Sequence, residues 1–223
     1  MSNPYIRNLI AKGEGQELDF KYYISSASKI AKTLAAFSNS GGGRLLIGVK
    51  DNGNIVGVES EEEVYMIQLA AERYCKPEVK LEMTSWDMDG LVVLEVYVDP
   101  GTEKPYYAKD DGGKWLVYIR KDDKNLLANK VLVEVFKRQK SEKANIIRYD
   151  LPESFLLDYL SENKQITFNQ FCRLAKIRPY LAERVLVNLV SIKMIEVRHT
   201  SQGDYFVLKE ASGDRRQESG VRR

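Results

Sequence analysis

The spacing of apolar residues predicts a helix, a glycine turn and a strand near the start of the chain. From residue 27 to residue 37 apolar side chains recur every three or four positions, which is typical of an amphipathic helix capped by one of the two preceding serines. Glycines at 41–43 end this helix, and the apolar run at 45–47 predicts a strand covered on both faces. Asn52–Gly53 predicts a hairpin, so we expect the helix to pack on the strand that it feeds.

The same reading places further elements around this segment. We expect helices at 4–12, 61–75 and 128–140, and strands at 18–22, 79–86, 91–98 and 114–120. The predicted fold class is α+β, with a mixed β-sheet and packed helices. A polar, charge-rich stretch at 137–145 predicts a linker to a second module.

The second module has a different order of elements. Helices are expected at 152–163, 168–177 and 179–192, followed by strands at 194–197 and 205–208. Three helices and a hairpin are the order of a winged helix-turn-helix, in which the third helix enters the major groove of DNA. We therefore divide the chain into one domain over 1–140, a winged-helix domain over 146–210 and a disordered tail over 211–223.

Composition narrows the class of protein. Apolar residues make up 43% of the 223 positions, enough for a core, and no stretch is long enough to span a membrane. The start of the chain has no signal-peptide pattern, and Cys75 and Cys172 have no CxxC partner, so we expect a reducing cytoplasm. The net charge of +2 lies entirely in the tail, so a nucleic-acid surface has to be a local patch.

Three acidic residues are candidates for catalysis. Glu14 and Asp19 flank the first predicted strand, and Asp51 follows the neighbouring one. Three carboxylates that converge at strand ends can hold Mg²⁺ or Mn²⁺ through oxygen ligands. The alternative is that all three are solvated acids beside turns. The glycines at 41–43 follow a helix instead of preceding one, which argues against a phosphate-binding loop.

Basic and aromatic residues are interleaved along the predicted strands. Cations that neutralise phosphates and tyrosines that stack on bases suit a nucleic-acid surface. The set is Lys21, Tyr22, Tyr23, Lys29, Lys32, Arg44, Lys104, Tyr106, Tyr107, Lys109, Arg120, Lys121 and Lys124. The alternative is that the tyrosines are half-buried and the lysines only solvate the surface.

The third helix of the C-terminal module carries Arg178 and Arg184, the candidates for DNA contact there. The module as a whole has nine basic and eight acidic residues, fewer positive charges than a DNA-reading module usually carries. Dimerisation, including a homodimer, or docking of a partner is therefore the alternative role.

Four stretches resemble one known family. They are Glu14-x4-Asp19-Phe20-Lys21, residues 36–53 with the sequence AFSNSGGGRLLIGVKDNG, Lys104-Pro105-Tyr106-Tyr107 and Tyr118-Ile119-Arg120. Over residues 13–140 the chain resembles the Schlafen AlbA-like domain. This resemblance implies a DNA-binding domain of a bacterial regulator, a setting in which a winged helix often follows.

The resemblance also implies a second activity. Eukaryotic Schlafen relatives are similar to metal-dependent RNases, and by position their metal ligands fall on Glu14, Asp19 and Asp51, with Asp19 one methylene shorter than the family's Glu. Our leading hypothesis is a cytoplasmic regulatory protein that binds nucleic acid, DNA rather than RNA. The alternatives are a divalent-metal-dependent nuclease acting on RNA or DNA and a protein-interaction adaptor.

Overall fold

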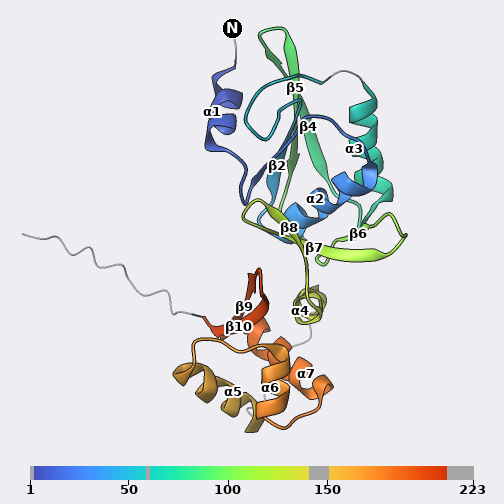
Figure 1. Cartoon of the computed structure of the whole chain (residues 1–223). Helices are drawn as coiled ribbons and strands as arrows, with labels where there is room; N and C mark the ends of the chain where they lie inside the picture. Colours follow the sequence, from blue (N-terminus) through green and yellow to red (C-terminus); the bar gives the residue numbers. More distant parts are fainter. Residues whose placement is uncertain (1–2, 59–60, 141–150, 210–223) are drawn as a thin grey trace, which may run out of the picture. The chain divides into compact units, whose positions relative to one another are not determined.

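The computed structural model in Figure 1 describes residues 3–58, 61–140 and 151–209. The chain divides into two compact units, residues 1–142 and 143–223, which are described separately. Most of the predicted linker and the whole tail at 211–223 lie outside the described residues. Within those residues, no helix is long and apolar enough to cross a membrane.

The first unit contains a four-stranded mixed sheet. Its strands, in order across the sheet, are β1 (Leu18–Lys21), β2 (Gly43–Ile47), β5 (Leu91–Val98) and β4 (Leu81–Met88). β1 and β2 are parallel and are joined by helix α2 (Ala27–Asn39), while the other neighbours are antiparallel. Leu45, Leu46 and Ile47 in β2 are fully buried, which confirms the prediction of a strand covered on both faces.

A second sheet holds the same helix from the other side. Its strands, in order, are β3 (Cys75–Lys76), β6 (Tyr107–Lys109), β7 (Trp115–Lys121) and β8 (Lys124–Leu127). Helix α2 packs against β6, β7 and β8, and its apolar residues share one core with Leu45 and Ile47 of the first sheet. Helix α2 is therefore almost entirely buried between the two sheets.

Three more helices complete this unit. They are α1 (Pro4–Lys12), α3 (Glu61–Arg73) and α4 (Lys130–Lys140). Helix α1 buries Ile6 against Phe20 and Leu46, on the face of the first sheet opposite α2 (Figure 1). Helix α3 packs beside α2, and α4 buries Phe136 against Val117 and Ile119 of β7.

The hairpin predicted at Asn52–Gly53 and the strand predicted at 79–86 both differ in extent from the expectation. After Asn52–Gly53 no regular strand forms, and the pairing is a single bridge between Val49 and Ile55. In the second hairpin β4 continues to Met88, because Asp89 and Gly90 alone make the turn, with φ angles of 60° and 88°. Positive φ at both central residues is the geometry of the tightest hairpin turns.

Over residues 151–209, the second unit forms three helices followed by a hairpin. They are α5 (Leu151–Glu162), α6 (Phe168–Leu174), α7 (Pro179–Ser191), β9 (Ile195–Thr200) and β10 (Gly203–Leu208). Helix α6 begins with a capping box between Thr167 and Gln170. Ile166, between α5 and α6, bridges Phe206 in β10, so the loop before α6 joins the edge of the hairpin.

Candidate nucleic-acid interface

Asn39, the last residue of α2, and Ser40, which follows it, hold the second sheet against α2 through hydrogen bonds. The Asn39 amide donates to the carbonyl oxygens of Tyr106 and Tyr118, at 2.7 and 2.8 Å, and its oxygen accepts from the Tyr106 N–H at 2.8 Å. Ser40 Oγ accepts from the Arg120 N–H at 2.9 Å. This polar segment therefore serves as a joint between α2 and strands β6 and β7.

The glycines that follow are required by close packing. A Cβ atom on Gly43 would lie 2.4 Å from the Phe37 ring, and one on Gly42 would lie 2.7 Å from the Val98 carbonyl oxygen. Gly42 also has a φ of +80°, a backbone conformation that favours glycine. The glycine run thus ends α2 and lets β2 start against it.

Two of the predicted acids lie together at β1. Glu14 Oε1 accepts from the Phe20 N–H at 2.8 Å, and Lys21 Nζ lies 2.9 Å from Asp19 Oδ2 and 4.0 Å from Glu14 Oε1. Burial raises the pKa of Glu14, the Phe20 N–H lowers it, and the hydrogen bond and negative charge of the adjacent Asp19 carboxyl raise it again. The two carboxyls therefore share one small space with a single ammonium group.

Arg120 closes this space from the interior. Its guanidinium is almost completely buried and lies 3.0 Å from Asp19 Oδ1, and it donates to the carbonyl oxygens of Gly15 and Leu18. A further N–H of the guanidinium donates to Asn125 Oδ1 at 3.0 Å. Arg120 is a predicted nucleic-acid contact, but the structure places its guanidinium on an internal carboxylate, where the residue is only 4% exposed.

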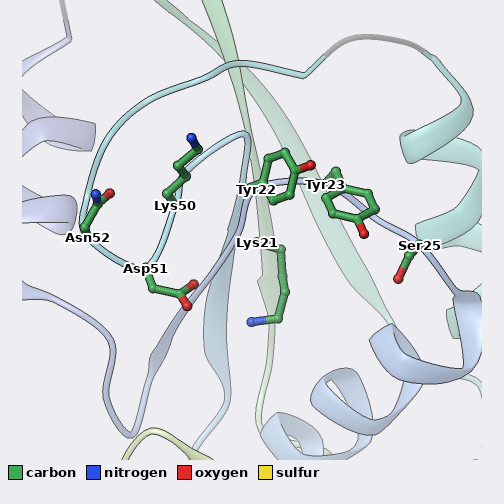
Figure 2. A pocket seen from close by; sticks show the side chains of 7 residues that line it. All are labelled: Lys21, Tyr22, Tyr23, Ser25, Lys50, Asp51 and Asn52. Carbon is green, nitrogen blue, oxygen red and sulfur yellow. The ribbon is translucent and has the colours of Figure 1, made fainter.

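The third predicted acid lies in the turn after β2. Asp51 is exposed, and Figure 2 shows its carboxylate and the Lys21 amino group directed into the same space. Lys21 lines one pocket with Asp51 and also pairs with Asp19, so it joins the turn to the acid pair. Across the described residues, no three His, Cys, Asp or Glu side chains are gathered closely enough to hold a metal ion.

The predicted ligands Glu14, Asp19 and Asp51 therefore do not form a metal site as they lie. Both oxygens of Asp19 are paired with cations, one with Arg120 and the other with Lys21. The donor chemistry suits a divalent cation, but an ammonium group holds the place between the acids, and the third carboxylate stands apart from the pair.

An open pocket of about 600 Å³ lies over β1 and the turn that carries Asp51 (Figure 2). The residues that line it are Lys21, Tyr22, Tyr23, Ser25, Lys50, Asp51 and Asn52. The rings of Tyr22 and Tyr23 meet edge to face, with centroids 4.3 Å apart, and each side chain is about half exposed. Lys50 Nζ lies 5.9 Å from the Tyr22 ring centroid. The pocket thus offers aromatic faces beside two ammonium groups.

Three other predicted contacts are used inside the fold. Arg44 lies on the face of the first sheet toward α1, where its Nε is 3.0 Å from Glu95 Oε1. Lys104 Nζ donates to the Ser40 carbonyl oxygen at 2.8 Å, and burial lowers the pKa of Lys104. Tyr106 is only 8% exposed and belongs to the core. The Tyr106 ring cannot stack on a base, and the two cations are committed to protein oxygens.

Three further predicted residues of this unit are exposed to solvent to different degrees. Lys32 and Tyr107 are half-buried; Lys32 Nζ lies 6.0 Å from the Tyr118 ring centroid, and Tyr107 packs near α4. Lys121 is exposed at the end of β7. None of these three lines the pocket of Tyr22 and Tyr23, so the predicted basic and aromatic residues do not gather at one site.

The pocket also contains residues that the sequence did not indicate for binding. Lys50 and Asn52 belong to the predicted turn, and Ser25 is one of the two serines predicted to cap the helix. Their positions in the sequence could have indicated the pocket. The turn after β2 and the segment after β1 both follow the carboxyl ends of two parallel strands, and these ends lie at the same edge of the sheet.

In the second unit both predicted arginines are accessible. Arg178 is exposed at the N-cap of α7, and Arg184 is exposed one and a half turns into the helix. Tyr180 is 67% exposed and, at a spacing of four residues, lies on the same helix face as Arg184. One end of α7 therefore presents two guanidinium groups and an aromatic ring.

The sequence model of the family described as Schlafen, AlbA_2 matches residues 14–129. The match covers more than half of the chain, and the chain belongs to the Schlafen AlbA_2 family. This span contains the acid pair, Arg120, the Asn39 joint and the tyrosine pocket. No curated protein matches the chain.

Two solved structures show similarity at low identity. The DIP2311 protein from Corynebacterium diphtheriae is 18% identical, with a TM-score of 0.45; the match covers 66% of this chain and 33% of that one. The chain thus matches about a third of the length of that protein. The N-terminal domain of a RecG-related protein from Nitrosomonas europaea is 24% identical, with a TM-score of 0.36, covering 52% of this chain and 87% of that one.

Proposed function

We propose that the protein binds nucleic acid in the pocket formed by Tyr22, Tyr23, Lys21 and Lys50, and that it acts as a DNA-binding regulator. The observation that carries this proposal is the half-exposed tyrosine pair beside ammonium groups. Aromatic rings bind bases of any sequence by stacking, and nearby cations neutralise the phosphates between them.

The charged side chains of the pocket would determine the orientation of a bound nucleic-acid strand. Lys50 is exposed and stands above Tyr22, so its ammonium is the group best placed for a phosphate. Lys21 is partly neutralised by Asp19, and Asp51 repels phosphate from that side. Backbone phosphates would therefore follow Lys50, while bases face the tyrosines.

The second unit is proposed to be a winged helix-turn-helix. Its order of three helices and a hairpin supports this, together with the bridge from Ile166 to Phe206 beside the hairpin. In such a domain α7 would enter the major groove, and Arg178, Arg184 and Tyr180 are the exposed side chains at its start. A homodimer formed by this unit remains the alternative prediction.

The test compares single-stranded DNA, duplex DNA and single-stranded RNA of one sequence with the full chain. Binding is followed by fluorescence anisotropy over a range of salt concentrations. Affinity should fall steeply with salt, because phosphate contacts release counterions. Equal binding at low and high salt, or no binding to any of the three, contradicts the proposal.

A divalent-metal-dependent nuclease is the second candidate. The observation that favours it is the contact between the Glu14 and Asp19 carboxyls around one positive group, with Asp51 facing the same space as Lys21. In place of that ammonium, Mg²⁺ or Mn²⁺ would supply a Lewis acid for phosphodiester cleavage. Cleavage of RNA or DNA with Mn²⁺ that is lost in Asp51→Asn supports this candidate. Asp123→Asn, an exposed aspartate outside the pocket, is the matched control.

A further inference from the structure

A second pocket, of about 530 Å³, lies at the N-terminus of α2. Three serines of the segment 25–28 form one wall, and Leu69 and Tyr74 form an apolar wall. The turn between β6 and β7 completes the pocket with Lys109, Asp110 and Asp111. Of its lining residues, Lys109 belongs to the predicted basic and aromatic set, and the pocket of Tyr22 and Tyr23 does not include it.

Among the described residues, the α2 end of the pocket carries one buried hydroxyl group without a hydrogen-bond partner. Helix α2 is 13 residues long, and its N-cap, Ser26, makes no side-chain capping hydrogen bond. Ser28 lines the pocket and is only 3% exposed, yet its hydroxyl oxygen has no hydrogen-bond partner in the part of the chain that the structure describes. A buried hydroxyl at a helix N-terminus is suited to an anion, because the first-turn amides and the helix dipole act in the same direction.

The other groups of the pocket define what the anion is attached to. Lys109 adds a positive charge, and the carboxylates of Asp110 and Asp111 weaken the attraction for an inorganic ion, so that such an ion has to be supplied in excess to compete. One Asp110 oxygen is held by the Lys114 N–H at 2.7 Å. Carboxylates accept hydrogen bonds from sugar hydroxyls, and Tyr74 adds an aromatic side chain, the kind of group on which bases stack, to the lining. The lining therefore suits a phosphate that carries a nucleoside.

The position of Ser25 connects this pocket to the first one. Ser25 lines both pockets, and in Figure 2 it lies between Tyr23 and the start of α2. We infer that the α2 pocket binds the terminal phosphate of the strand whose neighbouring bases occupy the pocket of Tyr22 and Tyr23. This inference rests on the proposed function. A terminal phosphate carries nearly twice the charge of an internal one, so it complements the helix N-terminus better.

The experiment uses the full chain and internally labelled single-stranded oligonucleotides of one sequence, with a 5′-phosphate, a 3′-phosphate or hydroxyls at both ends. One of the phosphorylated strands should bind about tenfold more tightly than the hydroxyl strand, the size of one charge-assisted hydrogen bond. Ser28→Ala and Lys109→Gln should remove that difference and keep the affinity for the hydroxyl strand. Lys114→Gln, an exposed lysine of the same turn outside the pocket, should keep the difference.

Inorganic phosphate in excess should also remove the difference between the strands. Equal affinity for all three strands, while they still bind, overturns the inference and leaves the proposed function intact. A preference that survives both Ser28→Ala and Lys109→Gln overturns it too, as does a free mononucleotide that binds as tightly as the phosphorylated strand. Failure of all strands to bind overturns the proposed function and this inference with it.

Discussion

The guanidinium of Arg120 lies 3.0 Å from the carboxylate of Asp19, and both side chains are almost completely buried. The two residues are 101 positions apart and belong to different sheets. Because Asp19 also pairs with Lys21, the buried Arg120 helps to position the acid that holds one lysine of the tyrosine pocket.

Replacing Arg120 should destabilise the first unit strongly. Arg120→Met leaves the Asp19 carboxylate buried without its guanidinium partner, which should cost about 3–5 kcal/mol. The measurement is the free energy of unfolding from urea denaturation. Lys121→Met, at the exposed neighbouring position, should change it by less than about 0.5 kcal/mol.

Adding Asp19→Asn to the Arg120→Met variant tests why the loss of Arg120 destabilises the first unit. If the uncompensated carboxylate is what destabilises, the double variant should be more stable than Arg120→Met alone. Strictly additive losses in this double-mutant cycle would mean that the two residues contribute independently.

Substitution of Asn39 should also destabilise the first unit strongly, although its side chain carries no charge. Asn39→Ala removes three hydrogen bonds and leaves the backbone groups of Tyr106 and Tyr118 without them, at a cost of about 2–4 kcal/mol. Asn52→Ala, an exposed asparagine of the turn after β2, is the control. Thermal unfolding that does not distinguish the two variants would show that the joint between α2 and the second sheet has no energetic importance.

Local patterns predicted most of the elements, because their signals lie within each segment. Helix α2, the buried β2 and the turn at Asp89–Gly90 are each specified by spacing or by glycine chemistry. Strands β3, β6 and β8 were not predicted. They are two to four residues long, and their pairing partners, not their own composition, make them strands.

The candidate site was predicted less completely, because burial depends on distant residues. Tyr106 and Arg120 look like parts of a cationic aromatic surface, yet one is buried by contacts with α2 and the other by an acid of β1. Conversely, Lys50 joins the pocket because β1 and β2 are parallel, a relationship that no single stretch of sequence contains.

The raised pKa of Glu14 predicts a specific dependence of stability on pH. Its ordinary value is 4.5, and in the folded protein burial and the adjacent Asp19 raise it. The folded state therefore binds more protons than the unfolded state just above pH 4.5, so this group's contribution to stability falls as pH rises through that window. Glu14→Gln keeps the acceptor for the Phe20 N–H and should flatten the fall in urea titrations. If the fall of stability with pH is unchanged in Glu14→Gln, it is caused by another group.

Salt and charge should affect binding through Lys50 in particular. Lys50→Gln should weaken binding of single-stranded nucleic acid at low salt. It should also reduce the slope of log affinity against log salt concentration by the amount expected for about one phosphate contact. Lys80→Gln, an exposed lysine outside the pocket, should leave both quantities unchanged. If both variants behave alike, the attraction comes from the general surface and not from the pocket.

The edge-to-face pair of Tyr22 and Tyr23 is proposed to bind nucleobases, and the affinity of Tyr22→Ala for a short single-stranded oligonucleotide tests this binding. We expect a loss of about 1–3 kcal/mol in binding free energy, the range for one stacked base, with little change in the free energy of unfolding because the ring is half exposed. Tyr65→Ala, an exposed tyrosine on α3 that lines neither pocket, should bind as the wild type does. Unchanged affinity in Tyr22→Ala, or an equal loss in Tyr65→Ala, would contradict the claim.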